Sequence, residues 1–143
     1  LKNGSIKLPK EDPLKLMKGF IKRAKKNKKD IVKFINEKIR KNKKIYLYGA
    51  STKGNTVLQY YKLNYKKIPF AAERSSHKYG KYTIGTGIKI ISEKKARRLR
   101  PDYFFVTPWG FMKEIIKREK NWLKNGGKFI VPFPKFKIIK YHE

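Results

Sequence analysis

The fold is decided by the stretch Ile45-Tyr46-Leu47-Tyr48-Gly49-Ala50-Ser51-Thr52-Lys53-Gly54-Asn55. Four consecutive strand-forming residues lead into a turn with two glycines, and we expect a helix from Thr56 to about Tyr61. A short apolar strand followed by a loop and a helix is typical of α/β folds, in which such loops lie at the carboxyl ends of parallel strands. The two glycines permit a tight turn and a close approach of the backbone to a neighbour.

The remainder of the chain continues the alternation of short apolar strands and helices. Further strands are predicted at residues 69–72, 88–91, 102–106, 128–131 and 136–139. Further helices are predicted at residues 92–99, capped by Ser92, and at residues 111–125, closed by Gly126 and Gly127. This pattern predicts an α/β fold, a Rossmann-like three-layer domain with a mostly parallel sheet, over residues 44–143.

A long Lys-rich helix is predicted ahead of this domain. Asp12 and Pro13 have the residue types of an N-cap and a first helical position, and apolar residues then recur at spacings of three, four and seven up to about Asn42. Lys28 interrupts the apolar face, so we expect a bend or break near residues 27–29. Residues 13–43 are therefore interpreted as a linking amphipathic helix. Residues 1–12, with an extended piece at 1–9, are interpreted as the tail of a preceding part of a longer polypeptide.

Composition restricts the classes of function. The 143 residues suit one core, and 39 Lys and Arg against 10 Asp and Glu give a net charge of +29. Lys outnumbers Arg by 32 to 7, and Ile outnumbers Leu by 16 to 9, which indicates a chain-wide bias more than a nucleic-acid interface. A nucleic-acid partner is thus disfavoured, although a polyanion (RNA) binding module built on the Lys-rich helix stays an alternative.

Absent residue types narrow the chemistry further. With no Cys and two His, the chain offers no disulfide, no thiolate metal site and no thiol nucleophile. No stretch approaches the roughly 18 apolar residues of a membrane span, and no signal-peptide pattern is present. We expect no membrane partner, no metal site within this chain and a cytoplasmic location.

The loop of residues 49–55 is the strongest candidate site. Helix N-termini offer free N–H groups to anions, and Ser51, Thr52, Lys53 and Asn55 add hydrogen bonds and charge. The loop differs from a P-loop because its Lys precedes the second glycine, which argues against an ATPase. Glu73 ends the next predicted strand, where dinucleotide folds place a ribose-binding carboxylate, so a freestanding nucleotide or dinucleotide-binding module stays an alternative.

Three further features follow other predicted strands. Residues 79–87 are rich in glycine and aromatic residues, which favours either a lid over a ligand or a packed Ω-loop. Trp109 has the chemistry to stack on a base or sugar at the rim of a crevice, or to pack in the core. His77 follows the predicted strand that ends at Glu73, but no partner is evident that would orient it as an acid or base. No catalytic residue is predicted within this chain.

A series of short segments, taken in order, resembles one family. The C-terminal domain of the SAM-dependent sugar C-methyltransferases is similar at residues 49–55, 73–74, 80–86, 101–103, 108–109 and 126–132. Residues 3–5 resemble the end of the catalytic domain that precedes it in this family, which implies that residues 1–12 are the end of a preceding methyltransferase domain. The sequence departs from the family at Gly110, where a polar His or Asn is expected, and at Lys89, where Pro is common.

The resemblance implies a three-part enzyme. Its N-terminal domain would bind zinc through cysteines, its middle domain would bind SAM, and the present domain would help to hold a nucleotide-linked keto-deoxysugar. A base removes a proton next to the sugar ketone in such enzymes, and the enolate takes the SAM methyl group. The isolated fragment is expected to be inactive, because the SAM site, the zinc site and the base would all lie upstream. The expected substrate-binding residues are Gly49, Ser51, Thr52, Lys53, Gly54, Asn55, Glu73, Arg74, Tyr82, Thr83, Gly85, Thr86 and Trp109.

Overall fold

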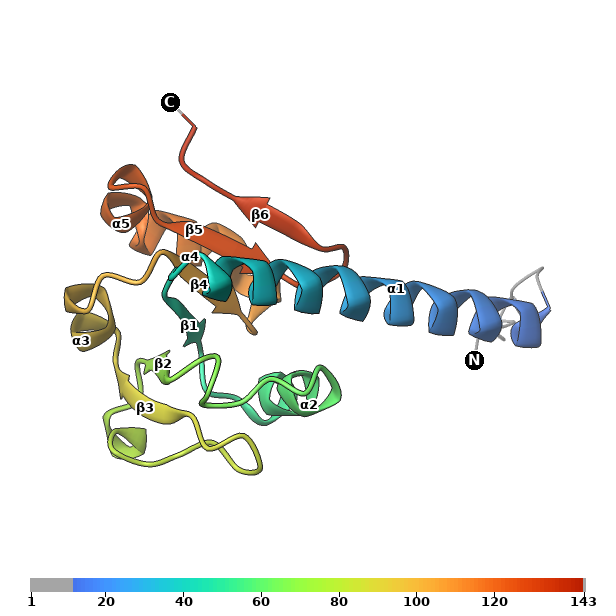
Figure 1. Cartoon of the computed structure of the whole chain (residues 1–143), viewed down its shortest axis with the longest axis horizontal. Helices are drawn as coiled ribbons and strands as arrows, with labels where there is room; N and C mark the ends of the chain where they lie inside the picture. The colour runs from blue at the N-terminus through green and yellow to red at the C-terminus, as the bar shows by residue number, and fades with distance from the viewer. Residues whose placement is uncertain (1–11, 143) are drawn as a thin grey trace, which may run out of the picture.

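The computed structural model describes residues 12–142, which form a six-stranded sheet flanked by helices, with a long N-terminal helix (Figure 1). The strands are β1 (Ile45–Tyr48), β2 (Phe70–Glu73), β3 (Lys89–Ser92), β4 (Tyr103–Val106), β5 (Lys128–Val131) and β6 (Lys137–Ile139). The helices are α1 (Pro13–Arg40), α2 (Thr52–Tyr60), α3 (Glu93–Arg98), α4 (Met112–Arg118) and α5 (Lys120–Lys124), with 3-10 turns η1 (Ser76–Lys78) and η2 (Trp109–Phe111). The extended piece expected at residues 1–9 lies outside the described residues.

The sheet is mostly parallel, as predicted. Its strand order is β3-β2-β1-β4-β5-β6, with β1 to β5 parallel and β6 antiparallel to β5. The chain leaves β1 toward one edge of the sheet and later returns to β4 on the other side of β1. The carboxyl ends of β1 and β4 therefore form a topological switch point, the place where open α/β sheets bind ligands.

Two apolar layers hold the helices against opposite faces of the sheet. On one face, Ile35 of α1 and Leu58 of α2 pack in the same cluster as Leu47 of β1. On the other face, the helices α3, α4 and α5 pack in a cluster with Tyr46 of β1 and Phe104 of β4. Alternate strand residues thus point to opposite faces, and both faces are covered. The predicted three-layer arrangement is confirmed.

α1 is one uninterrupted helix, so the break expected near residues 27–29 is wrong. The Asn27 side-chain amide donates hydrogen bonds to the Pro132 carbonyl oxygen at 2.8 Å and to the Tyr61 hydroxyl at 3.3 Å. The Lys28 ammonium lies 4.3 Å from the centre of the Tyr60 ring. Polar and cation–π contacts therefore continue the packing of α1 where the apolar pattern stops.

Two helix boundaries differ from those predicted. α2 begins at Thr52 and not at Thr56, because the Ser51 hydroxyl accepts a hydrogen bond from the Gly54 N–H at 3.0 Å and caps the helix. The single helix expected at residues 111–125 is wrong, since η2, α4 and α5 divide this stretch. The division between α4 and α5 falls at Glu119, whose side chain turns into the core.

Both glycines of the loop after β1 allow close packing against the residues that follow β4. A Cβ built on Gly54 would lie 2.5 Å from Cβ and Oγ1 of Thr107, and one built on Gly49 would lie 2.9 Å from Cδ of Pro108. Gly49 also has a φ of +85°, which disfavours residues with a side chain. The absence of side chains at these two positions is what lets α2 begin directly beside the end of β4.

Gly54→Ala tests this constraint. Alanine normally stabilises a helix by about 1 kcal/mol relative to glycine, but here we expect a loss of about 1–3 kcal/mol because the new methyl group overlaps Thr107. Urea unfolding of the two variants measures the change. Gly110→Ala is the matched control, because a Cβ at Gly110 meets nothing within 4 Å. A Gly54→Ala variant at least as stable as the original protein would contradict the packing argument.

Candidate functional site

A hollow of about 360 Å³ opens at the carboxyl ends of β1, β2 and β4, beside α4. We call it the switch-point hollow. Its lining residues are Tyr48, Gly49, Ala50, Ser51, Ala72, Glu73, Arg74, Lys78, Glu93, Pro108, Phe111, Glu114, Ile115 and Arg118. Its volume is in the range of small-molecule sites, and it lies where the topology predicts one.

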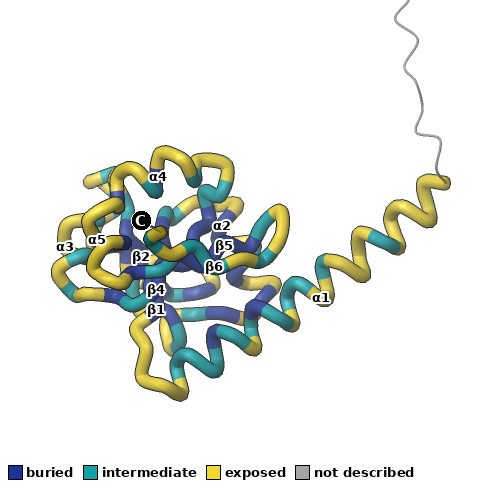
Figure 2. Tube along the Cα trace, turned by 90° about the horizontal axis from the view of Figure 1, so that it is seen from above, coloured by how far each residue is buried: buried dark blue, intermediate teal, exposed yellow. Residues whose placement is uncertain are grey.

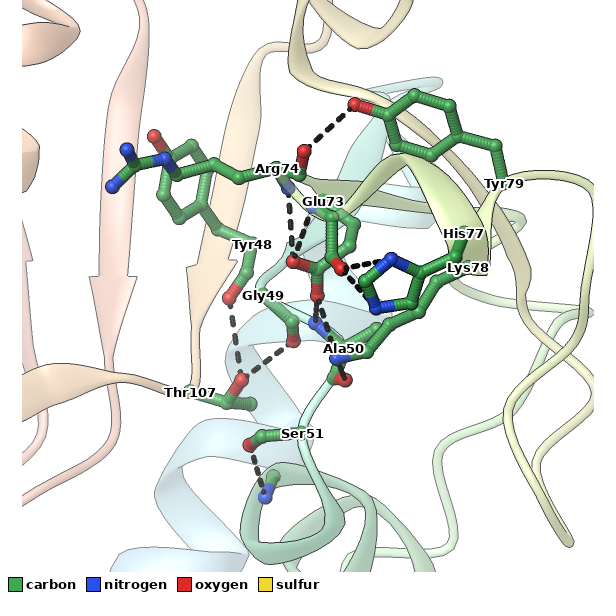
Figure 3. Close-up of polar contacts among 12 residues, drawn as sticks. Tyr48, Gly49, Ala50, Ser51, Glu73, Arg74, His77, Lys78, Tyr79 and Thr107 are labelled. Atoms are coloured by element: carbon green, nitrogen blue, oxygen red, sulfur yellow. Dashed lines mark hydrogen bonds and ion pairs between the residues drawn. The ribbon is translucent and has the colours of Figure 1, made fainter.

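Hydrogen bonds join the three strand ends that form the rim (Figure 3). The Thr107 hydroxyl, directly after β4, lies 2.8 Å from the Gly49 carbonyl oxygen and 3.2 Å from that of Tyr48. The Gly49 N–H donates to the Ala72 carbonyl oxygen of β2 at 2.8 Å. These contacts hold the strand ends together through the backbone and the short Thr107 side chain.

Glu73 fastens the loop after β1 to the turn after β2 (Figure 3). Its carboxylate accepts from the backbone N–H groups of Ala50 at 3.0 Å, Arg74 at 2.9 Å and Ser75 at 3.1 Å, and Lys78 lies 3.4 Å away. Burial alone would raise the pKa of Glu73, but these three donors and the Lys78 ammonium outweigh it and hold the pKa below its ordinary value. The carboxylate is ionised and already occupied.

The contacts of Glu73, Gly49 and Gly54 differ from those of a dinucleotide-binding fold. Dinucleotide folds use a carboxylate at this position to accept ribose hydroxyls, and glycines to let the pyrophosphate approach the backbone. Here Glu73 accepts from the protein itself, and the space beside Gly49 and Gly54 is filled by Pro108 and Thr107. The loop after β1 thus has the sequence features of a cofactor loop, but its glycines serve internal packing.

A buried polar network supports the floor of the switch-point hollow. The Tyr48 hydroxyl donates to Oε1 of Glu119 at 2.8 Å and accepts from Nε of Arg118 at 3.1 Å. Arg97 contacts the same Glu119 oxygen at 2.6 Å, and Arg118 also donates to Glu93 at 3.2 Å. Burial raises the pKa of Tyr48, and the Glu119 carboxylate raises it further, so the hydroxyl stays a protonated donor. The network orients Arg118 toward the hollow.

Three lining groups remain free to contact a ligand. Arg74 and Glu114 make no ion pair within residues 12–142, and the Phe111 ring is 62% exposed. Figure 3 shows the Arg74 side chain extending toward Tyr48. A guanidinium suits phosphate, a carboxylate suits sugar hydroxyls, and an aromatic ring suits a base or a sugar face.

A second, smaller hollow of about 180 Å³ lies between the loop after β1 and residues 82–84. It includes Ser51, Thr52, Asn55, Tyr82 and Thr83 among the predicted site residues. The Ser51 side chain faces this region while its hydroxyl caps α2. Tyr82 is 60% exposed and stands at the edge of this hollow.

The loop of residues 79–87 is held against α2 by hydrogen bonds. The Asn55 side-chain amide donates to the Ile84 carbonyl oxygen, and its oxygen accepts from the Thr86 hydroxyl at 2.8 Å. The Thr83 and Thr86 hydroxyls lie 2.6 Å apart, and Thr86 is 3% exposed. Asn55, Thr83 and Thr86 therefore position this loop, which has the contacts of a packed Ω-loop.

The other predicted residues lie outside the switch-point hollow. Trp109 packs on Phe133 with ring centres 4.8 Å apart, and the Lys53 ammonium lies 4.8 Å from the centre of the Trp109 ring. Gly85 packs against Gln59 of α2. His77 is exposed on η1, and Ser75 is its side-chain partner within the described part of the chain.

Sequence reasoning missed the α4 side of the switch-point hollow. Phe111, Glu114 and Arg118 recur at spacings of three and four, so they share one face of the helix that follows β4. That spacing was available as a signal, but it equally describes the solvent face of any amphipathic helix. Lys78 was missed for a different reason, because only the folded turn η1 brings it next to Glu73.

Residues 12–142 carry neither a helix with the length and hydropathy to cross a membrane nor a metal-binding group of three or more His, Asp or Glu side chains. The fold and the hollow define a Rossmann-like α/β domain with a ligand-sized opening at its switch point.

The chain belongs to the C-methyltransferase C-terminal domain family, whose profile matches residues 10–134. It is 40% identical over 92 residues to the C-methyltransferase NovU of Streptomyces niveus. The matched stretch covers 64% of this chain and 22% of that relative, so the chain spans about a fifth of the relative's length. The family suspected from the sequence is confirmed.

Glu73→Gln tests how much the hydrogen bonds from three backbone N–H groups to the Glu73 carboxylate stabilise the fold. At pH 7 we expect a loss of about 2 kcal/mol in the free energy of unfolding, because three backbone donors lose a charged acceptor. The pKa of Glu73 is lower in the folded chain than its ordinary 4.5, so its stabilising contribution is full above that value and disappears as the pH falls through the lowered pKa. The penalty of the substitution should therefore shrink in acid.

Urea unfolding at pH 7 and pH 3 measures both effects. Glu114→Gln is the matched control, with an expected change below about 0.5 kcal/mol, because Glu114 makes no ion pair in the described region. Equal penalties for Glu73→Gln at both pH values would show that the charge of Glu73 does not contribute.

Proposed function

We propose that this domain binds a nucleotide-linked keto-deoxysugar on behalf of a SAM-dependent C-methyltransferase. The observation that carries the proposal is the switch-point hollow, with Arg74 and Glu114 unpaired within the described residues. The family membership supplies the reaction class, and the hollow supplies the part of that reaction that this chain has the chemistry to perform.

The free groups of the hollow suit the parts of such a substrate. Arg74 would contact a phosphate oxygen, and the net charge of +29 would favour a diphosphate over a neutral sugar. Glu114 would accept a hydrogen bond from a sugar hydroxyl, and Phe111 would cover a base or a sugar face. Tyr82 lines the smaller hollow and would contact an extended part of the same ligand. Lys53 lies against the Trp109 ring and lines neither hollow.

The chemical step is assigned to the remainder of the enzyme. A base there would remove the proton from the carbon next to the sugar ketone, and the resulting enolate carbon would form a bond to the methyl group of SAM as the sulfur leaves. The Tyr48 hydroxyl, the most buried acidic proton of the hollow, is held by Glu119 and Arg118 and is not suited to act as that base. SAM, and zinc if present, would bind outside this chain. The fragment alone would bind substrate without turnover.

Arg74→Gln tests the proposal. Calorimetric titration with a nucleoside-diphosphate hexose such as dTDP-glucose should give a dissociation constant raised about 10-fold or more, because one charge-assisted contact to phosphate is lost. Arg98→Gln is the matched control, since Arg98 is exposed on α3, lines none of the hollows described above and changes the net charge equally. Its dissociation constant should change less than about twofold.

Two results would count against the site. One is unchanged binding in Arg74→Gln, and the other is an equal loss in Arg98→Gln, which would mean that net charge alone attracts the nucleotide. Circular dichroism of both variants checks that the fold is retained.

A basic groove along α1 favours a second candidate function, polyanion binding. The groove has a volume of about 790 Å³ and no carboxylate in its lining. Its cations are Lys25, Lys28, Lys29, Lys33, Arg40, Lys62 and Lys67, and none of them makes an ion pair in residues 12–142. Asp30 and Glu37 of α1 instead pair with Lys26, Lys38 and Lys41.

Two triple variants distinguish binding at this groove from a general effect of net charge, because each removes three positive charges. If the groove binds single-stranded RNA, replacing Lys28, Lys29 and Lys33 by Gln should reduce the slope of log affinity against log salt by about 2, at roughly 0.7 per lost phosphate contact. The control replaces Lys94, Lys95 and Lys113, which lie on α3 and α4. Equal slopes for the two triple variants would contradict a groove-specific site.

A further inference from the structure

The first half of α1 extends beyond the carboxyl edge of the sheet. The end of α1 lies at the amino edge, where Lys43 and the Lys44 N–H contact Asp102 just before β4. Asn27 lies at the carboxyl edge, because it donates to the Pro132 carbonyl oxygen directly after β5. Residues 13–26 therefore continue past that edge by about 21 Å, at 1.5 Å per residue. Figure 2 shows this half of the helix reaching away from the other elements, with most of its trace exposed.

The projecting half carries an apolar stripe, which we call the α1 seam. Its residues are Leu14, Leu16, Met17, Phe20 and Ile21, with exposed fractions of 60%, 41%, 54%, 64% and 44%. At 100° per residue, they lie on the same side of α1 as the buried Ile31 and Ile35. The α1 seam thus continues the core-facing side of the helix and borders the space above the carboxyl edge.

The charges beside the seam restrict what can cover it. Residues 13–29 contain no Asp or Glu, and the projecting half carries six cations: Lys15, Lys18, Lys22, Arg23, Lys25 and Lys26. At 100° per residue, Lys18, Arg23 and Lys25 flank the α1 seam, and the other three lie on the opposite side of the helix. Two copies packed seam to seam would place the flanking cations against one another, which disfavours self-association. An apolar surface with carboxylates at its rim would match both the stripe and its flanks.

We propose that the α1 seam docks on the catalytic part of the same methyltransferase polypeptide, in an apolar groove with an acidic rim. The inference rests on the proposed function, since it requires the domain to work within a larger enzyme. The family is a C-terminal domain, and the stretch matched here is 22% of the NovU chain, so most of that relative lies outside the match.

The α1 seam lies at the same edge of the sheet as the switch-point hollow, so docking there would also position the partner relative to the hollow. A partner held by the α1 seam lies over the carboxyl edge, which also carries the switch-point hollow and its exposed Phe111 ring. The seam would therefore hold the catalytic part opposite the bound nucleotide sugar. This would bring the sugar carbon to the methyl donor without any catalytic residue from this chain.

Hydrogen–deuterium exchange on the complete polypeptide, without ligand, tests the docking. An undocked segment with Gly19 and six cations is a weak helix, so its amides should exchange fast unless they are covered. We expect residues 14–24 to be protected, and we expect Met17→Gln with Phe20→Gln to accelerate their exchange at least about 30-fold. Lys15→Gln with Lys22→Gln, on the opposite side of α1, should change it less than about threefold. Residues 29–36 serve as the internal reference.

Three results would overturn the docking. The first is equally fast exchange of residues 14–24 in all forms, which would mean that nothing covers the seam. The second is protection that disappears on dilution together with a fall from dimer to monomer mass, and the third is protection that appears only with anionic lipid vesicles. The nucleotide-sugar titration reads the switch-point hollow and not the seam. Failure of the original protein to bind dTDP-glucose would therefore overturn the proposed function, whereas lost seam protection with normal binding would overturn the docking alone.

Discussion

The carboxyl edge of the sheet depends on the contact between Gly54 and Thr107. Because Gly54 has no side chain, α2 begins against the residue that ends β4, and the Thr107 hydroxyl can then reach the Gly49 carbonyl oxygen at 2.8 Å. Gly49 in turn bonds to Ala72, and Glu73 bonds back to the loop after β1. One series of close contacts therefore fixes three strand ends and shapes the hollow between them.

This arrangement separates groups that maintain the fold from groups that are free for a ligand. Glu73 accepts hydrogen bonds from three backbone N–H groups, and Asn55 and Thr86 bond to each other to hold the loop of residues 79–87. Arg74 and Glu114 have no such partners among the described residues. Under the proposed function, Arg74 and Glu114 would contact a phosphorylated sugar, whereas the buried Thr86 and Thr107 hydroxyls hold the loops around the site in place.

The sequence predicted the fold better than the site. Strand positions, the mostly parallel sheet and the long helix followed from apolar runs, which reflect burial directly. The break expected at Lys28 failed because Asn27 packs through hydrogen bonds that no apolar pattern records. The loop of residues 49–55 lies at the rim, as predicted. Its glycines are required because Thr107 and Pro108, more than fifty residues away in the sequence, leave no space for a side chain. Arg118 was missed since only the folded network with Tyr48 and Glu119 orients it.

The switch-point hollow is the proposed binding site of a nucleotide sugar. Amide chemical-shift mapping of the 17.0 kDa chain during titration with dTDP-glucose tests it most directly, because every loop reports at once. We expect the largest shifts at residues 49–52, 73–75 and 110–114, around the hollow. Shifts gathered instead along residues 25–40 of the basic groove, or no shifts at millimolar ligand, would contradict it.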